Sequence, residues 1–238
     1  MQEKKTIAIL QSCYIPWKGY FDIVGLVDEF VLYDETQYTR RDWRNRNRIK
    51  TAAGLTWLTI PVNVKSKYHQ LIAETEIQDS RWAASHFRSI EVNYRRAAHF
   101  QDYAGLIEDL YAKAANEKRL SKVNELFLKA LCELLDIPTQ ITQSSDYGSE
   151  GQKTDRLISI CLRAGATDYL SGPSAKDYLE PEKFAAHGIN LHFMDYSGYP
   201  EYRQLFGAFE HEVSIVDLLF NEGPSAQEFM KTRLIKPS

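Results

Sequence analysis

The chain has few cysteines and no long apolar run, and each shortage excludes a class of protein. Three cysteines in 238 residues (Cys13, Cys132 and Cys161) are too few and too scattered for a disulfide framework or a zinc site. No stretch approaches the roughly 18 uninterrupted apolar residues of a spanning helix. The charged N-terminal segment is followed by too short an apolar run for a signal peptide. These absences predict a cytoplasmic protein with reduced thiols and no membrane span.

Several catalytic signatures are missing as well. There is no G-x-S-x-G elbow, no H-E-x-x-H motif and no Walker A loop. The six histidines do not pair at i+3 or i+4 and none neighbours a cysteine, so we predict no metal site. Cys13 stays a candidate nucleophile because it follows the first strand, although no partner histidine is identifiable. A net charge of −3 makes nucleic-acid binding an unlikely purpose of the whole surface and still allows a local basic pocket.

Strand and helix patterns alternate, which predicts an α/β fold with a mostly parallel, Rossmann-like sheet. We expect strands at 6–11, 29–34, 55–64, 71–78, within 137–147, at 167–172 and at 189–196, with 55–64 and 71–78 forming a hairpin or edge extension. Helices are expected at 21–28, 153–165, 174–188, 214–223 and 225–231. Residues 80–136 are helical throughout and would be an insertion or lid within a single domain, 1–238.

The turn after the first strand is the first candidate site. Ligands of open α/β sheets bind beyond the carboxyl ends of strands, and helix N-termini there attract anions. A glycine in such a turn would let a phosphate approach the backbone. The alternative is that its aromatic residues only fill the core. The candidate binding residues are Gln11, Tyr14, Trp17, Gly19 and Tyr20.

The Arg/Asn segment, residues 37–50, is the second candidate. Guanidinium groups bind carboxylates and phosphates in bidentate fashion, and aromatic residues can stack on a ring. A solvated basic loop is the alternative. We take Asp34, at the preceding strand end, as the general base and three cations as charge stabilisers. The candidates are Asp34, Arg41, Arg46 and Lys50 for catalysis, and Gln37, Tyr38, Trp43, Asn45 and Asn47 for binding.

Two later strand ends carry further candidates. Ser171, Gly172, Ser174 and Lys176 could cradle a phosphate, or form an ordinary turn and helix cap. Asp195 and Tyr196 begin a tyrosine-rich stretch that suits a sugar or nucleoside, or is a surface turn.

Together these segments resemble the WbqC-like protein family. Residues 11–21 are similar to the signature Q-P-x-Y-x-P-W-x-G-Y-F, with Ser12 where the family usually has proline. Gln37-Tyr38, the run from Arg41 to Lys50, residues 57–61 and residues 169–172 also resemble the family, so the resemblance covers nearly the whole chain.

The resemblance implies work on bacterial surface polysaccharide (O-antigen). The expected reaction is transfer of an amino-acid or acyl group, such as glycyl, to the amine of a nucleotide-linked amino sugar. ATP and Mg²⁺ would be needed if the donor is a free amino acid, but not for a thioester or aminoacyl-tRNA. The alternatives are a binding module without chemistry, nucleotidyl transfer, and RNA binding.

A weaker similarity concerns the nucleotidyltransferase turn P-x-T-x-G-H-x-x-x-I. Trp17 and Tyr20 stand where the H-x-G-H motif of those proteins has its first and second histidine. Their replacement argues against ordinary nucleotidyl transfer and leaves nucleotide binding at the same turn open, with residues 171–176 as a second phosphate contact.

Overall fold

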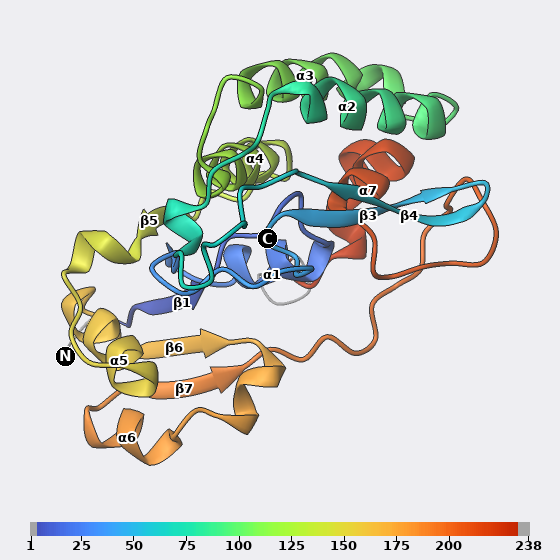
Figure 1. The fold of residues 1–238 in the computed structure, drawn as a ribbon. Helices are drawn as coiled ribbons and strands as arrows, with labels where there is room; N and C mark the ends of the chain where they lie inside the picture. The colour runs from blue at the N-terminus through green and yellow to red at the C-terminus, as the bar shows by residue number, and fades with distance from the viewer. Residues whose placement is uncertain (1–3, 233–238) are drawn as a thin grey trace.

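The computed structural model describes residues 4–232, and its centre is a parallel sheet of five strands (Figure 1). Along the sheet the order is β5-β2-β1-β6-β7, and every neighbouring pair is parallel. The strands are β1 (Thr6–Leu10), β2 (Glu29–Leu32), β5 (Gln140–Gln143), β6 (Asp168–Ser171) and β7 (Asn190–Phe193). The predicted α/β fold with a Rossmann-like sheet is therefore confirmed.

Helices cover both faces of this sheet. Alternate residues of β1 explain the arrangement: Ala8 belongs to one core cluster, whereas Ile7 and Ile9 belong to the other. The Ala8 face packs against α1 (Lys18–Gly25), α4 (Leu120–Leu134) and α7 (Ile215–Glu222). The opposite face packs against α5 (Lys153–Arg163) and α6 (Pro181–Ala186).

The helical middle of the chain consists of α2 (Arg81–Tyr94), α3 (Phe100–Ala114) and α4. All three contribute to the same hydrophobic cluster as α1 and the first turn. In Figure 1, α2 and α3 lie outside α4 and farther from the sheet. None of the helices between residues 4 and 232 combines the length and apolar character needed to cross a membrane.

The predicted pairing of 55–64 with 71–78 is present as an isolated antiparallel bridge between Val62 and Ile77, and not as a hairpin of two strands. The hairpin is formed by β3 (Arg46–Thr51) and β4 (Gly54–Thr59), so most of the Arg/Asn segment is a strand and its approach. A tight turn joins the two strands, with Gly54 at φ 105°. Residues 72–74 form a 3₁₀ turn instead of a strand because the N–H of Ala73 donates to the Asp34 carbonyl oxygen at the end of β2.

Several element boundaries also differ from the prediction. Helix α1 begins at Lys18, three residues earlier than expected, directly after Pro16 and Trp17. The predicted helix over 174–188 divides into a 3₁₀ turn, Pro173–Asp177, and α6, because Pro181 starts a new helix. The last predicted helix is a 3₁₀ segment, Gly223–Phe229.

Candidate functional site

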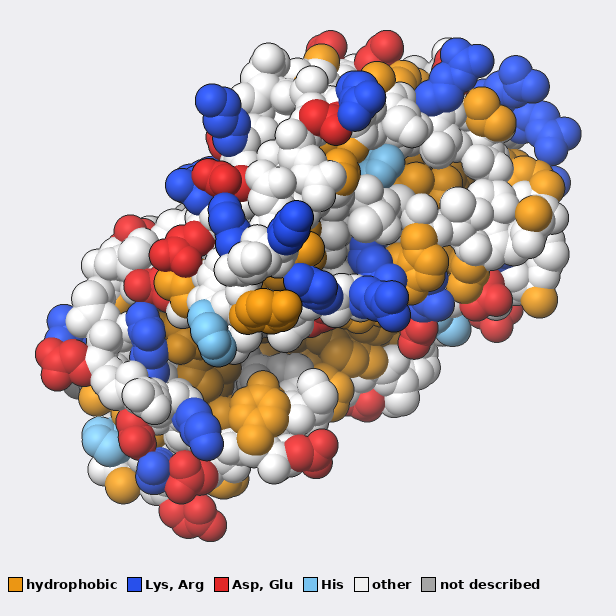
Figure 2. All heavy atoms as spheres, in the orientation of Figure 1, with side chains coloured by type: hydrophobic (Ala, Val, Ile, Leu, Met, Phe, Trp, Pro, Cys, Tyr) orange, Lys and Arg blue, Asp and Glu red, His pale blue; other side chains and the backbone are white. Residues whose placement is uncertain are grey.

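A pocket of about 980 Å³ opens at the carboxyl ends of β1 and β6. These strands are neighbours, and the chain proceeds from β1 to β2 on one side and from β6 to β7 on the other. Ligands of parallel α/β sheets bind in the crevice at such a reversal of strand order. Figure 2 shows a hollow with largely hydrophobic walls, bordered by Lys and Arg side chains. The pocket includes eight of the predicted residues: Gln11, Trp17, Tyr20, Trp43, Asn47, Gly172, Ser174 and Tyr196.

The turn that leads into α1 has a strained backbone. Ile15 has φ 34°, which is unusual for a β-branched residue. The amide Nδ2 of Asn47 donates to the carbonyl oxygens of Tyr14, at 3.1 Å, and Ile15, at 2.9 Å. The N–H of Ile215, the first residue of α7, donates to the Pro16 carbonyl oxygen at 2.9 Å. Strand β3 and helix α7 thus fix the shape of the turn, and Asn47 acts as a clamp as well as a lining residue.

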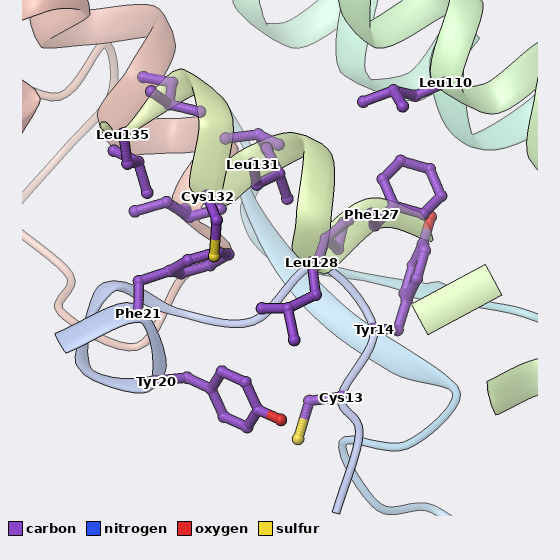
Figure 3. Close-up of a cluster of buried hydrophobic side chains, with 14 of the residues drawn as sticks. Cys13, Tyr14, Tyr20, Phe21, Leu110, Phe127, Leu128, Leu131, Cys132 and Leu135 are labelled. Atoms are coloured by element: carbon purple, nitrogen blue, oxygen red, sulfur yellow. The ribbon is translucent and has the colours of Figure 1, made fainter. Parts of the chain in front are cut away.

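Two predicted residues of this turn have other roles. The Tyr14 side chain is fully buried, and its hydroxyl lies 2.6 Å from that of Tyr111 and 2.9 Å from His86 Nδ1. In Figure 3 Tyr14 lies near Phe127, whereas the Tyr20 hydroxyl points towards Cys13 on the pocket side. A Cβ atom on Gly19 would come within 2.3 Å of the Trp17 indole. The Trp17 ring leaves no room for a side chain at position 19. This packing accounts for the glycine without a phosphate close to the backbone.

Aromatic rings form one wall. The Trp17 indole meets the rings of Tyr196 and Tyr199 edge-on, with centroids 5.0 and 5.8 Å away. The Tyr199 hydroxyl donates to the buried Asp22 carboxylate at 2.5 Å. Tyr199 and its neighbours belong to the long connection 194–213, which joins β7 to α7 without a regular helix or strand. These contacts give the pocket an aromatic, apolar wall against which a ring of a ligand can pack.

Arg44 is the charged group most deeply set in the lining. Its side chain is only 13% exposed. Nη1 donates to the Ser12 carbonyl oxygen at a long 3.3 Å, and Nη2 lies 3.8 Å from Asp42 Oδ1. Nε has no hydrogen-bond partner among the described residues. A buried guanidinium with unused donors is suited to a phosphate or carboxylate group of a ligand.

Asp34, the predicted base, is not part of the pocket lining. It is 3% exposed, and Oδ1 accepts from the Ser12 N–H at 2.8 Å. Proline, expected at position 12 from the family resemblance, would lack that N–H. Burial raises the pKa of Asp34, against the opposing effects of the Ser12 hydrogen bonds and Arg44. Burial also raises the pKa of the Cys13 thiol to about 11, so the thiolate is scarce at neutral pH.

The other predicted cations lie outside the pocket lining. Arg46 stacks over Trp57, with its guanidinium carbon 4.0 Å from the ring centroid, and also donates to the Arg41 carbonyl oxygen. Arg41 is exposed and has φ 61°. Lys50 is 4% exposed, and its Nζ donates to Gln204 Oε1 and to the Ala208 carbonyl oxygen. Lys50 therefore anchors the 194–213 connection.

The remaining predicted binding residues also lie outside the lining. Asn45 donates to the Ile60 carbonyl oxygen and Gln37 to that of Tyr68, while Tyr38 is buried. On the other side, Ser171 is buried beside the Tyr169 hydroxyl, Lys176 lies over the Phe193 ring, and Asp195 accepts from Ser197. These side chains therefore make their contacts within the protein, outside the pocket.

Four lining residues with polar groups were not chosen as catalytic or binding residues from the sequence: Arg44, Tyr199, His211 and Glu212. Arg44 belongs to the predicted Arg/Asn segment, in which nothing in the pattern distinguishes one arginine from another. Tyr199 belongs to the noted tyrosine-rich stretch. His211 and Glu212 carry no local signal, since they reach the pocket only through the path of the 194–213 connection. Among residues 4–232, no three His, Cys, Asp or Glu side chains gather closely enough to hold a metal ion.

The fold and pocket define an α/β protein with a pocket at the switch point of a parallel sheet. The chain belongs to the WbqC-like protein family, whose model matches residues 11–229. It is 48% identical to Rv1507c, an uncharacterized protein of Mycobacterium tuberculosis, over 227 residues that make up 95% of this chain and 98% of that protein. No solved structure matches. Family membership suggests a role in polysaccharide-related biosynthesis.

Proposed function

We propose that this protein transfers an amino-acid or acyl group, such as glycyl, to the amine of a nucleotide-linked amino sugar for surface polysaccharide. The single observation that carries the proposal is the buried Arg44 guanidinium beside the aromatic wall of the pocket. A sugar ring can stack on Trp17 and Tyr196, while an attached phosphate takes the free donors of Arg44. The pocket volume, about 980 Å³, is large enough for both reactants.

The chemistry requires an amine to attack an acyl carbonyl carbon. A C–N bond forms, the bond from the carbonyl carbon to the leaving group breaks, and the leaving group departs with the electron pair. The proton lost by the amine must go to a base. His211 and Glu212 are the lining residues with side chains able to accept it, and they replace Asp34 in this role within the proposal.

A binding module without chemistry is the second candidate. It is favoured by the burial of two reactive groups near the first turn. The Asp34 carboxyl is enclosed, and burial keeps the Cys13 thiol protonated. If neither His211 nor Glu212 acts on the substrate, the pocket would recognise a polysaccharide precursor without changing it. Product analysis separates the two candidates.

The test combines binding with product analysis. UDP- and dTDP-linked amino sugars should raise the melting temperature of the wild-type protein. Arg44→Gln should weaken binding by about 10- to 100-fold, the worth of a charge-assisted bidentate contact, and Arg44→Lys should restore part of it. The control is Arg88→Gln, an exposed arginine on α2. Mass spectrometry with glycine and ATP, and with glycyl-tRNA or a glycyl thioester, should show an amino sugar heavier by one glycyl group.

Two outcomes count against the proposal. Equal binding by wild type and Arg44→Gln would remove Arg44 from the site. Binding without any product, whatever the donor, would favour the binding module.

A further inference from the structure

Two tryptophans stand partly exposed beside the pocket. Trp43, from the loop before β3, and Trp57, on β4, are 38% and 40% exposed. Their ring centroids are 5.3 Å apart, with an angle of 41° between the planes. Neither ring is needed for the core, since neither belongs to a buried hydrophobic cluster. The solvent-exposed part of each indole provides a stacking surface for a flat ring.

Two arginines of β3 frame these indoles. The hairpin register places Arg48 opposite Trp57, and Arg46 lies two residues earlier on the same strand face. The Arg46 guanidinium carbon is 4.0 Å from the Trp57 centroid, and that of Arg48 is 5.3 Å from both tryptophan centroids. The Nε atoms of both arginines are buried and have no hydrogen-bond partner among the described residues. Trp43, Trp57, Arg46 and Arg48 together are called the platform below.

The platform is continuous with the pocket. Trp43 lines the pocket and is also half of the indole pair. Glu212 lines the pocket too, and its carboxylate pairs with Arg48 at 2.5 Å. Figure 2 shows Lys and Arg side chains along the edge of the hollow. A ligand held by Arg44 can therefore extend over the pocket edge onto the indoles without leaving the protein surface.

We propose that the platform is a second subsite, which binds the nucleobase and the phosphate on the nucleoside side of the substrate, while the pocket holds the sugar and its attached phosphate at Arg44. This inference rests on the proposed function and assigns the two halves of its substrate to separate places. A nucleobase stacks on an indole whatever its hydrogen-bonding pattern, and the arginines supply donors to the phosphate on the nucleoside side. A single nucleotide fits better than a long nucleic acid because the net charge of the chain is −3.

The experiment measures binding of UDP, dTDP, uridine, pyrophosphate and glucosamine 1-phosphate by calorimetry to the full chain. Trp57→Ala should weaken the binding of UDP, dTDP and uridine by about 10-fold, the typical contribution of one stacked base. It should not change the binding of glucosamine 1-phosphate. Trp57→Phe should recover most of the loss, since it keeps a ring. Arg46→Gln should weaken the binding of UDP and pyrophosphate and leave the binding of uridine unchanged. Tyr178→Ala, an exposed aromatic outside the pocket lining, is the control.

Comparison with Arg44→Gln separates the two proposals. If Trp57→Ala weakens the binding of nucleotides and Arg44→Gln changes the binding of no compound, the platform is supported and the assignment of Arg44 to the pocket site is wrong. If Arg44→Gln weakens glucosamine 1-phosphate while Trp57→Ala leaves all nucleotides unchanged, the platform is overturned alone. Trp57→Ala could instead abolish binding of a single-stranded oligoribonucleotide without changing the binding of UDP or dTDP. That result would also overturn the platform proposal and would indicate RNA binding. Melting curves of each variant ensure that a loss of binding is not a loss of fold.

Discussion

Asn47 holds Ile15 in a left-handed backbone conformation. Its Nδ2 donates to the Ile15 carbonyl oxygen at 2.9 Å, while Ile15 has φ 34° and is fully buried. Such a conformation persists only where the surroundings determine it, and it is common where a backbone shapes a binding site. Here a strand from one part of the sequence fixes the turn on which the pocket is built.

Asn47→Asp should therefore be strongly destabilising. The two carbonyl oxygens of Tyr14 and Ile15 would face a carboxylate, which has no N–H to donate. Leaving buried acceptors without donors predicts a loss of about 3 kcal/mol in the free energy of unfolding, measured in urea. Asn116→Asp is the matched control, since that exposed amide also donates to a backbone carbonyl, at 3.0 Å. Equal stability of Asn47→Asp and the control would show that the clamp is not needed.

Gly19→Ala should disturb the aromatic wall. The new Cβ would lie 2.3 Å from the Trp17 indole, so the ring must move away from its contact with Tyr196. Overpacking of this kind costs about 1–3 kcal/mol. We expect lower stability in urea, altered tryptophan fluorescence and weaker binding of UDP-linked amino sugars.

Gly105→Ala is its control, because a Cβ on that helical glycine meets nothing within 4 Å. It should be neutral or gain up to about 1 kcal/mol from helix propensity. A Gly19→Ala protein that binds and unfolds like Gly105→Ala would contradict the proposed reason for the glycine.

Lys18 gives a prediction about pH. This lysine is 3% exposed, with its Nζ 4.7 Å from the Tyr199 centroid and 3.2 Å from the Pro200 carbonyl oxygen. Burial lowers the pKa of Lys18 from 10.5 to about 8, against the opposing attraction of Asp22 and Asp217. Between these pH values the unfolded chain holds a proton that the folded chain has released. The contribution of Lys18 to the free energy of unfolding therefore rises with pH from about 8 to 10.5.

Comparison with Lys18→Met isolates this effect, since all other groups titrate in both proteins. The cost of burying the charge is fully present below pH 8. Wild type should consequently gain on the order of 2–3 kcal/mol relative to Lys18→Met as the pH is raised to 10.5. Urea unfolding at pH 7, 8, 9 and 10.5 measures the difference. A difference that does not change with pH would mean that the amine keeps an ordinary pKa.

The sheet was predictable because its strands are short apolar runs between helical patterns. The hairpin was not, and Asn47 shows why. In β3 the inward positions include Asn47, whose function is to bond a distant turn, so the strand lacks the apolar alternation that would identify it. Residues 71–78 have that alternation in part. The N–H groups of Ile72 and Ala73, however, donate to carbonyl oxygens in the segment just after β2, and Ile77 pairs with Val62 in a single bridge.

The site was predictable at the level of segments and less so for individual side chains. The first turn, the Arg/Asn segment and the two later strand ends do meet at one pocket, because parallel strands end at the same edge of the sheet. Within the Arg/Asn segment, Arg44 enters the pocket while Lys50 bonds Gln204, and only the backbone path separates these roles. Glu212 reaches the same pocket from a connection without sequence periodicity.

The connection 194–213 is attached to the rest of the protein at separate points: Tyr199 to Asp22, Tyr202 to Asp217, and Gln204 and Ala208 to Lys50. Between these points the connection contains no regular helix or strand. A substitution at His211, whose ring contacts Phe209 of the same connection, can therefore alter which ligand fits while the path of the chain is preserved. A wall of this construction would let the shape of the pocket diverge between related proteins without any change to the parallel sheet beneath it.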